Sequence, residues 1–118
     1  MSHPKITLFS VHKDAMAAAV DAFARDWPEA QTDNLLDDGL FRWVGETKGV
    51  VPGMYEPFEA HTRYMVERAA DAILFTCSAF QPCIDAVMSR HAIPMLKPND
   101  AMIEQALDTA SRVAVLAT

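Results

Sequence analysis

The sequence predicts an α/β fold in which helices cover both faces of a mostly parallel sheet of four to five strands. Short apolar, β-branched runs alternate with amphipathic segments along the 118 residues. The run 72–76 (Ala-Ile-Leu-Phe-Thr) is apolar on both faces, as expected for a parallel strand between two helical layers. With 51% apolar and 22% charged residues, the composition is that of one globular domain that needs no metal or disulfide to be stable.

Hydrophobic periodicity predicts the individual elements. The first helix is expected to be capped by Asp14 and to end before Pro28, and a later one begins at Pro57. The helix after Phe80 tolerates Pro82 in its first turn. Strands are expected at 6–11, 31–36, 72–76, 93–96 and 112–118, and helices at 14–27, 57–69, 80–88 and 98–110.

The segment 37–57 is the least regular part of the chain. It holds all four glycines of the chain and two prolines, which predicts a long excursion with one helical turn. Excursions of this length in a compact domain are usually lids or substrate loops.

Strands that alternate with helices imply a parallel sheet with right-handed crossovers, and hence a flavodoxin-like three-layer α/β/α domain. Ligands of such sheets bind at the carboxyl ends of the strands, near the topological switch point. This rule selects His12, the pair 37–38, the run 76–80 and the run 97–99 as candidate site residues.

The net charge and the lengths of the apolar runs argue against several classes of function. The formal net charge is −6 and no basic cluster is present, which argues against nucleic acid and against an anionic membrane surface as partners. No apolar run has the length of a bilayer crossing or of a signal peptide. Two cysteines do not make a disulfide scaffold, so we expect a cytoplasmic protein with reduced thiols.

Cys77 is the candidate catalytic residue. It follows a buried strand and precedes a helix, whose N-terminus carries unpaired N–H donors and partial positive charge. We therefore expect its pKa to lie below the usual value of about 8.5 for a thiol. The amides of Ser78, Ala79 and Phe80, with the Thr76 and Ser78 hydroxyls, are suited to hold a carboxylate. The structural alternative is that Cys77 is a small buried side chain at the end of the strand.

The other candidates are weighed in the same way. His12 is predicted to contact substrate, whereas His61 and His91 are more simply structural or solvated. Lys97 either pairs with a carboxylate or is a solvated loop lysine. The pair 37–38 either holds a polar substrate group or forms a turn.

The sequence also argues against three other site types. A cysteine phosphatase needs an arginine six residues after its cysteine, and here that residue is Cys83, which we expect in the core. The spacing of the two cysteines matches no metal site. The turn 10–14 also lacks the glycine- and hydroxyl-rich phosphate loop of a flavin-binding protein.

The stretch 70–80 (Ala-Asp-Ala-Ile-Leu-Phe-Thr-Cys-Ser-Ala-Phe) resembles the first-cysteine motif of the aspartate/glutamate/hydantoin racemase superfamily. The stretch 93–102 looks like the next strand and helix of its members, and the first strand with His12 and the run 34–38 are similar to the same group. The resemblance covers essentially the whole chain, and the Thr-Cys-Ser-Ala piece is its most specific part.

The resemblance implies an enzyme without a cofactor, built from two similar α/β domains with the active site between them. Racemases of this type place one cysteine from each domain on opposite faces of the substrate α-carbon. Arylmalonate decarboxylases and maleate isomerases share the fold with fewer or different cysteines. By this likeness Cys77 is the first-domain catalytic cysteine, and Thr76, Ser78 and Ala79 hold the substrate carboxylate.

The chain is about half as long as members of that family. We therefore expect residues 1–111 to form one α/β domain that resembles the N-terminal half of such a racemase, with 112–118 starting a further strand and the second domain absent. The chain is then a piece of a longer enzyme, a form that lost its other half, or one of two copies that build a site together. An exposed C-terminal strand favours association, so a homo-oligomer is the protein partner it predicts.

Three functions remain open at this stage. The leading one is a racemase-like isomerase that acts next to the carboxylate of an amino acid or similar small acid, with Cys77 as acid/base thiol. The second is a single-thiol decarboxylase or cis–trans isomerase of a dicarboxylate. The third is a non-catalytic flavodoxin-like domain that binds a small anion or a partner protein.

Overall fold

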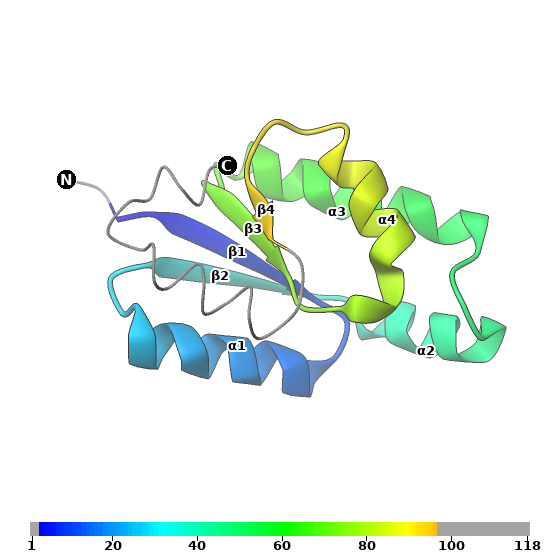
Figure 1. Cartoon of the computed structure of the whole chain (residues 1–118), viewed down its shortest axis with the longest axis horizontal. Coiled ribbons are helices and arrows are strands. Elements are labelled where there is room, and N and C mark those ends of the chain that lie inside the picture. The colour runs from blue at the N-terminus through cyan, green and yellow to red at the C-terminus, as the bar shows by residue number, and fades with distance from the viewer. Residues whose placement is uncertain (1–2, 97–118) are drawn as a thin grey trace.

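The structure, a computed structural model, describes residues 3–96 (Figure 1). Its elements in chain order are β1 (Lys5–Ser10), α1 (Lys13–Asp26), β2 (Gln31–Leu36), α2 (Asp38–Thr47), the 3₁₀ helix η1 (Pro52–Met54), α3 (Tyr55–Glu67), β3 (Ala72–Phe75), the 3₁₀ helix η2 (Ser78–Phe80), α4 (Gln81–Met88) and β4 (Met95–Leu96).

The four strands form one parallel sheet in the order β2-β1-β3-β4. In the register, Phe9 of β1 lies opposite Leu35 of β2 on one side and Phe75 of β3 on the other. The predicted flavodoxin-like α/β fold with a parallel sheet is therefore confirmed.

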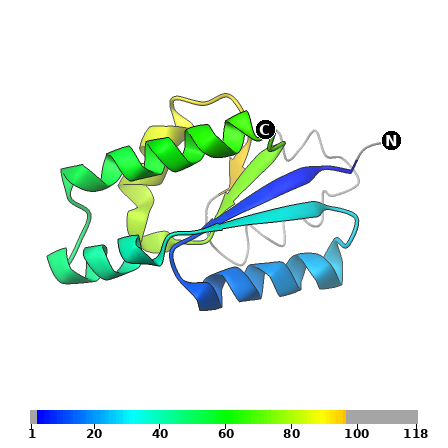
Figure 2. The same ribbon diagram turned by 180° about the vertical axis from the view of Figure 1, so that it is seen from behind.

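Helices cover the two faces of the sheet unequally. Helix α1 lies on one face, and α3 and α4 lie on the other (Figures 1 and 2). The larger core is on the α3 side, where the ring of Phe58 packs against Phe9, Phe75 and Phe80 with ring centroids 5.0–6.3 Å apart. The smaller core lies under α1 and is formed by Ile6, Leu8, Ala19, Phe23, Trp27, Ala72 and Leu74.

The segment 37–57 is not the irregular excursion that its glycines predict, because it contains the ten-residue helix α2. The Asp37 carboxylate caps this helix by accepting a hydrogen bond from the Leu40 amide at 3.3 Å. Leu40 and Val44, one turn apart, bury the apolar side of α2 against α3 and its neighbours. Burial of that side outweighs the cost of the two glycines within the helix. The helix ends at Lys48, which has the left-handed φ of 56°.

Two predicted helix starts are also corrected. Helix α1 begins at Lys13 and its N-cap is His12, so Asp14 lies in the first turn rather than at the cap. Helix α3 begins at Tyr55, two residues before Pro57, because proline is tolerated in a first turn where the N–H has no helical partner.

Some expectations concern residues beyond the described range. Lys97, the helix predicted at 98–110 and the strand predicted at 112–118 all lie outside residues 3–96. Within that range, none of the helices combines the length and the apolarity that a bilayer crossing requires.

Candidate functional site

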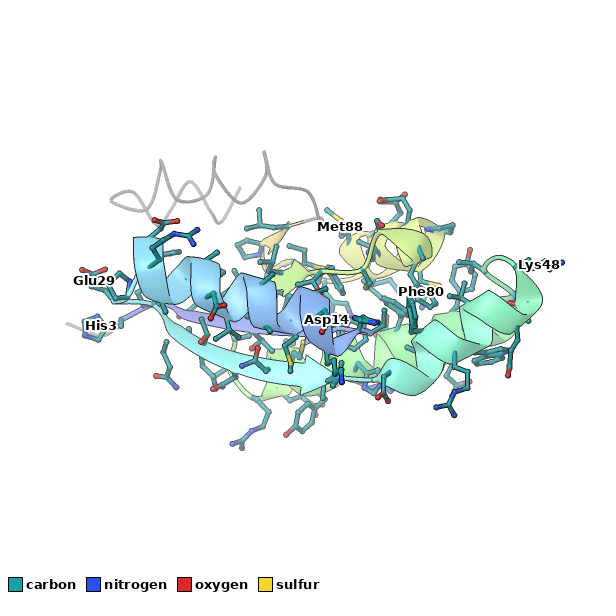
Figure 3. The ribbon with its side chains drawn as sticks, turned by 90° about the horizontal axis from the view of Figure 1, so that it is seen from below. His3, Asp14, Glu29, Lys48, Phe80 and Met88 are labelled. Carbon is teal, nitrogen blue, oxygen red and sulfur yellow. The ribbon has the colours of Figure 1, made fainter. Side chains whose placement is uncertain are left out.

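The topological switch point lies between β1 and β3, the two central strands. The chain leaves β1 through α1 toward β2, whereas it leaves β3 through α4 toward β4, on the other side of the sheet. The connections after these two strands therefore run to opposite sides of the sheet. Open α/β sheets bind ligands at the point where such connections diverge. Figure 3 shows Asp14 and Phe80 toward one end of the strands, and His3 and Glu29 at the opposite end.

Hydrogen bonds join the strand ends at this edge. The Thr76 hydroxyl donates to the Ser10 hydroxyl oxygen at 2.7 Å, and Ser10 is fully buried. The Asp37 amide donates to the Ser10 carbonyl at 2.9 Å, and the Thr76 amide donates to the Phe9 carbonyl at 3.0 Å. The residues that follow β2, β1 and β3 therefore form one continuous row.

His12 follows β1 by two residues, at the same edge of the sheet. Its Nδ1 accepts a hydrogen bond from the Asp14 amide at 3.1 Å, so the imidazole caps α1. The ring of Phe41, from α2, meets the imidazole edge to face, with centroids 4.9 Å apart. The side chain of His12 is 41% exposed, so part of the ring is open to solvent.

Cys77 follows Thr76 in an extended conformation and occupies the cap position of η2. Its side chain belongs to the large core on the α3 side, together with Phe75, Phe80 and Cys83, and only 5% of the residue is exposed. Because side chains alternate along a strand, Thr76 points to the opposite face of the sheet. The thiol and the hydroxyl pair are thus neighbours in sequence that lie on different faces.

The expected lowering of the Cys77 pKa is wrong. Burial raises the pKa of the Cys77 thiol to about 12, since a thiolate there would lose its hydration. A hydrogen bond from the Cys77 backbone opposes this shift only in part, and the nearby Cys83 adds to it. The helix that follows is the three-residue η2, too short to supply the dipole that the sequence argument assumed. The thiol is therefore protonated near neutral pH.

The remaining predicted site residues fall in three groups. Ser78 and Ala79 are exposed and lie in η2, beside Cys77. His12 and Thr76 lie at the ends of the two adjacent central strands. Lys97 is outside the described residues. Cys83 is fully buried in α4, as expected for a core residue, and burial raises its pKa to about 11.

A contact between His61 and Asp37 is not predicted from the sequence. His61 Nε2 lies 2.9 Å from the Asp37 Oδ2, and its ring packs on Phe9 at 5.2 Å. The same carboxylate caps α2, so this pair ties α2 to α3 at the carboxyl edge. No sequence pattern predicts this contact, because the two residues are 24 positions apart and only the packing of α3 on β1 brings them together.

A second histidine–carboxylate contact lies farther along α3. His91 Nε2 is 2.8 Å from the Glu59 Oε2, with Arg63 and Arg90 within 4 Å of the same carboxylate. These charges link α3 to the end of α4. Across residues 3–96, no three histidine, cysteine or acidic side chains are grouped so as to hold a metal ion.

The likeness to known proteins was tested in three ways. No match was found. A scan against protein-family models, a search of curated proteins and a search of solved structures each returned nothing. The residues at the switch point offer hydroxyl and imidazole hydrogen-bond groups, and a protonated thiol follows Thr76 in the chain.

Proposed function

We propose that this chain carries part of a cofactor-independent site that transfers a proton at the carbon next to a carboxylate, with Cys77 as its thiol. One observation carries the proposal: Cys77 directly follows the Ser10–Thr76 hydroxyl bond at the switch point of the sheet. A ligand at this edge would meet exposed hydrogen-bond donors, and the protonated Cys77 S–H lies in the same short loop.

The substrate carboxylate would be held from two sides. The imidazole of His12 and the hydroxyl of Thr76 belong to the ends of β1 and β3, while Ser78 and the η2 amides follow Cys77. The His12 imidazole, the Ser78 hydroxyl and the η2 amides can donate hydrogen bonds to a carboxylate oxygen, whereas the Thr76 hydroxyl already donates to Ser10 and fixes the strand ends. Hydrogen bonds from such donors become stronger as the carboxylate gains negative charge, which happens when the neighbouring carbon loses a proton or CO₂.

The raised pKa assigns Cys77 the role of proton donor. In the racemase-like form of the proposal, a base outside this half removes the α-proton, and the Cys77 S–H delivers its proton to the opposite face of the carbon. Cys77 then becomes a thiolate, which takes a proton back from solvent. The base comes from a second copy of this chain or from a further domain, because a thiol with a pKa of about 12 is not ionised near neutral pH.

The same pKa favours a second form, decarboxylation with a single thiol. Here the bond between the α-carbon and one carboxylate breaks, CO₂ leaves, and the electron pair stays on the α-carbon as an enediolate. The Cys77 S–H then protonates that carbon and is restored from solvent. This form needs no base, so every group it uses lies within the residues described above.

The experiment compares the two forms in heavy water. Wild-type chain, at several protein concentrations, is incubated with aspartate, with glutamate or with methylmalonate. Deuterium at the α-carbon of the amino acids without CO₂ release supports the racemase-like form, and it should rise with protein concentration if a second copy supplies the base. Release of CO₂ from methylmalonate with deuterium in the product supports the decarboxylase form.

A Cys77→Ser variant should abolish either reaction, because a hydroxyl is a far weaker acid than a thiol. Cys83→Ser is the matched control, because it makes the same replacement of sulfur by oxygen in the core and leaves the proposed proton donor unchanged. Equal activity of the Cys77→Ser variant and the wild type would reject the named thiol. Binding of these acids without any reaction would favour the non-catalytic anion-binding domain.

A further inference from the structure

The geometry of His12 determines which of its ring nitrogens carries the proton. The Asp14 backbone amide lies 3.1 Å from Nδ1 and can only donate a hydrogen bond, so Nδ1 must offer its lone pair. In the neutral imidazole the proton then resides on Nε2. The cap of α1 and an Nε2–H donor are therefore two consequences of one tautomer.

The imidazole is also fixed in orientation. Its Nδ1 is held by the first turn of α1, and the ring packs against that of Phe41 in a T-shaped arrangement with an interplanar angle of 70°. Among residues 3–96, no protein group is hydrogen-bonded to Nε2. With the side chain 41% exposed, the Nε2–H is a donor without a protein acceptor, held in place at the end of β1.

We infer that His12 acts as a neutral imidazole whose Nε2–H donates a hydrogen bond to the substrate carboxylate oxygen on which negative charge grows. This inference rests on the proposed function and assigns a specific role to one residue of that site. Both forms of the reaction pass through an enediolate, and a neutral imidazole at a helix N-terminus is an effective donor to such an oxygen. Protonation of Nδ1 would remove the acceptor that caps α1, so the neutral ring serves both roles.

Two substitutions separate the donor role from the capping role. In His12→Asn the side-chain oxygen can still accept from the Asp14 amide, but no donor reaches the position of Nε2. In His12→Gln the longer amide places an N–H near that position. The Asp14→Ala variant keeps the backbone amide and removes only the carboxylate, 3.7 Å from Nδ1, so it controls for charge.

The first measurement is the tautomer of His12 in the full chain, read from two-bond ¹H–¹⁵N spectra of the imidazole. The Nε2–H form is expected in the wild type and in Asp14→Ala. An Nδ1–H form would overturn the inference, whatever the chain does with substrates. Aspartate or methylmalonate is then added, and the Nε2 resonance of His12 is expected to move.

The second measurement is the rate of the reaction defined above. The His12→Asn variant should have the same urea midpoint of unfolding as the wild type. Its reaction should be about 10²–10³-fold slower, as expected when one donor to a developing oxyanion is lost. His12→Gln should stay within about tenfold of the wild type. Equal rates for His12→Asn and the wild type would overturn the inference.

The outcomes distinguish the inference from the proposed function. Turnover with an unmoved Nε2 resonance overturns the inference and leaves the proposed function standing. A moved resonance without turnover supports His12 as the donor and overturns the proposed chemistry. An unmoved resonance without turnover overturns both.

Discussion

The hydroxyl of Thr76 donates a 2.7 Å hydrogen bond to the hydroxyl of Ser10, and this bond ties the end of β3 to the end of β1 at the switch point. Ser10 has no exposed surface and Thr76 is half-buried, so the bond is partly shielded from solvent. A buried hydroxyl that lost its partner would keep the cost of its desolvation. The pair therefore holds the two strand ends, and with them His12 and Cys77, in a fixed relation.

Ser10→Ala should lower the free energy of unfolding by about 1 kcal/mol, because the Thr76 hydroxyl would keep only a 3.5 Å contact to the Phe9 carbonyl. Urea unfolding followed by fluorescence measures this difference. The matched control is Ser78→Ala, at an exposed position, which should change the free energy by less than about 0.5 kcal/mol. Similar values for the two variants would mean that the buried bond contributes little.

Alkylation should be slow at Cys77 in the folded chain. Raising the pKa from 9.0 to about 12 lowers the thiolate fraction near neutral pH, and thus the rate with iodoacetamide, by about a thousandfold. The rate is measured by peptide mass spectrometry, with the urea-unfolded chain as the reference. Rapid labelling of Cys77 in the folded chain would contradict the burial described here and restore the thiolate expected from the sequence.

Stability should fall in alkaline solution through Cys77. The folded chain binds the thiol proton more tightly than the unfolded chain, so this contribution is complete below about pH 9 and is lost as the pH rises toward about 12. The loss is up to about 1.4 kcal/mol for each pH unit in this interval. Urea unfolding at a series of pH values should show a shallower decline for Cys77→Ala. Parallel curves for the variant and the wild type would show that Cys77 does not titrate in this way.

A double-mutant cycle should detect the bond between Asp37 and His61. Asp37→Asn retains an oxygen to cap α2, and His61→Gln retains a polar group on α3, so each change mainly weakens the 2.9 Å contact. Both side chains are about one-third exposed, which limits the coupling to about 1 kcal/mol or less. Urea unfolding of the two single variants and the double variant gives the coupling energy. Strict additivity would show that α2 and α3 are held by apolar packing alone.

Much of the fold could be predicted from the sequence because its signals are local. The apolar run 72–75 forms a central strand, buried along its whole length, and the stripe of Phe58, Thr62 and Met65 forms the buried side of α3. The alternation of strands and helices was enough to predict the parallel sheet and the switch point. For the same reason the sequence could place His12 and the run 76–80 after two strands of the sheet, which the structure shows to be the adjacent strands β1 and β3.

Helix α2 could not be predicted in the same way, because its stability is not local. Two glycines lower its intrinsic helix propensity, and the burial of Leu40 and Val44 against α3 compensates. The bond from Asp37 to His61 likewise depends on where α3 lies over β1.

For Cys77, the sequence by itself determined that a sulfur follows a buried parallel strand at the carboxyl edge of the sheet. Only the tertiary structure decided its ionisation. The alternation of side chains turns Cys77 into the core of Phe75 and Phe80, and the helix that follows it is a single short turn. Loss of hydration therefore exceeds the attraction of the helix end, and the thiol keeps its proton.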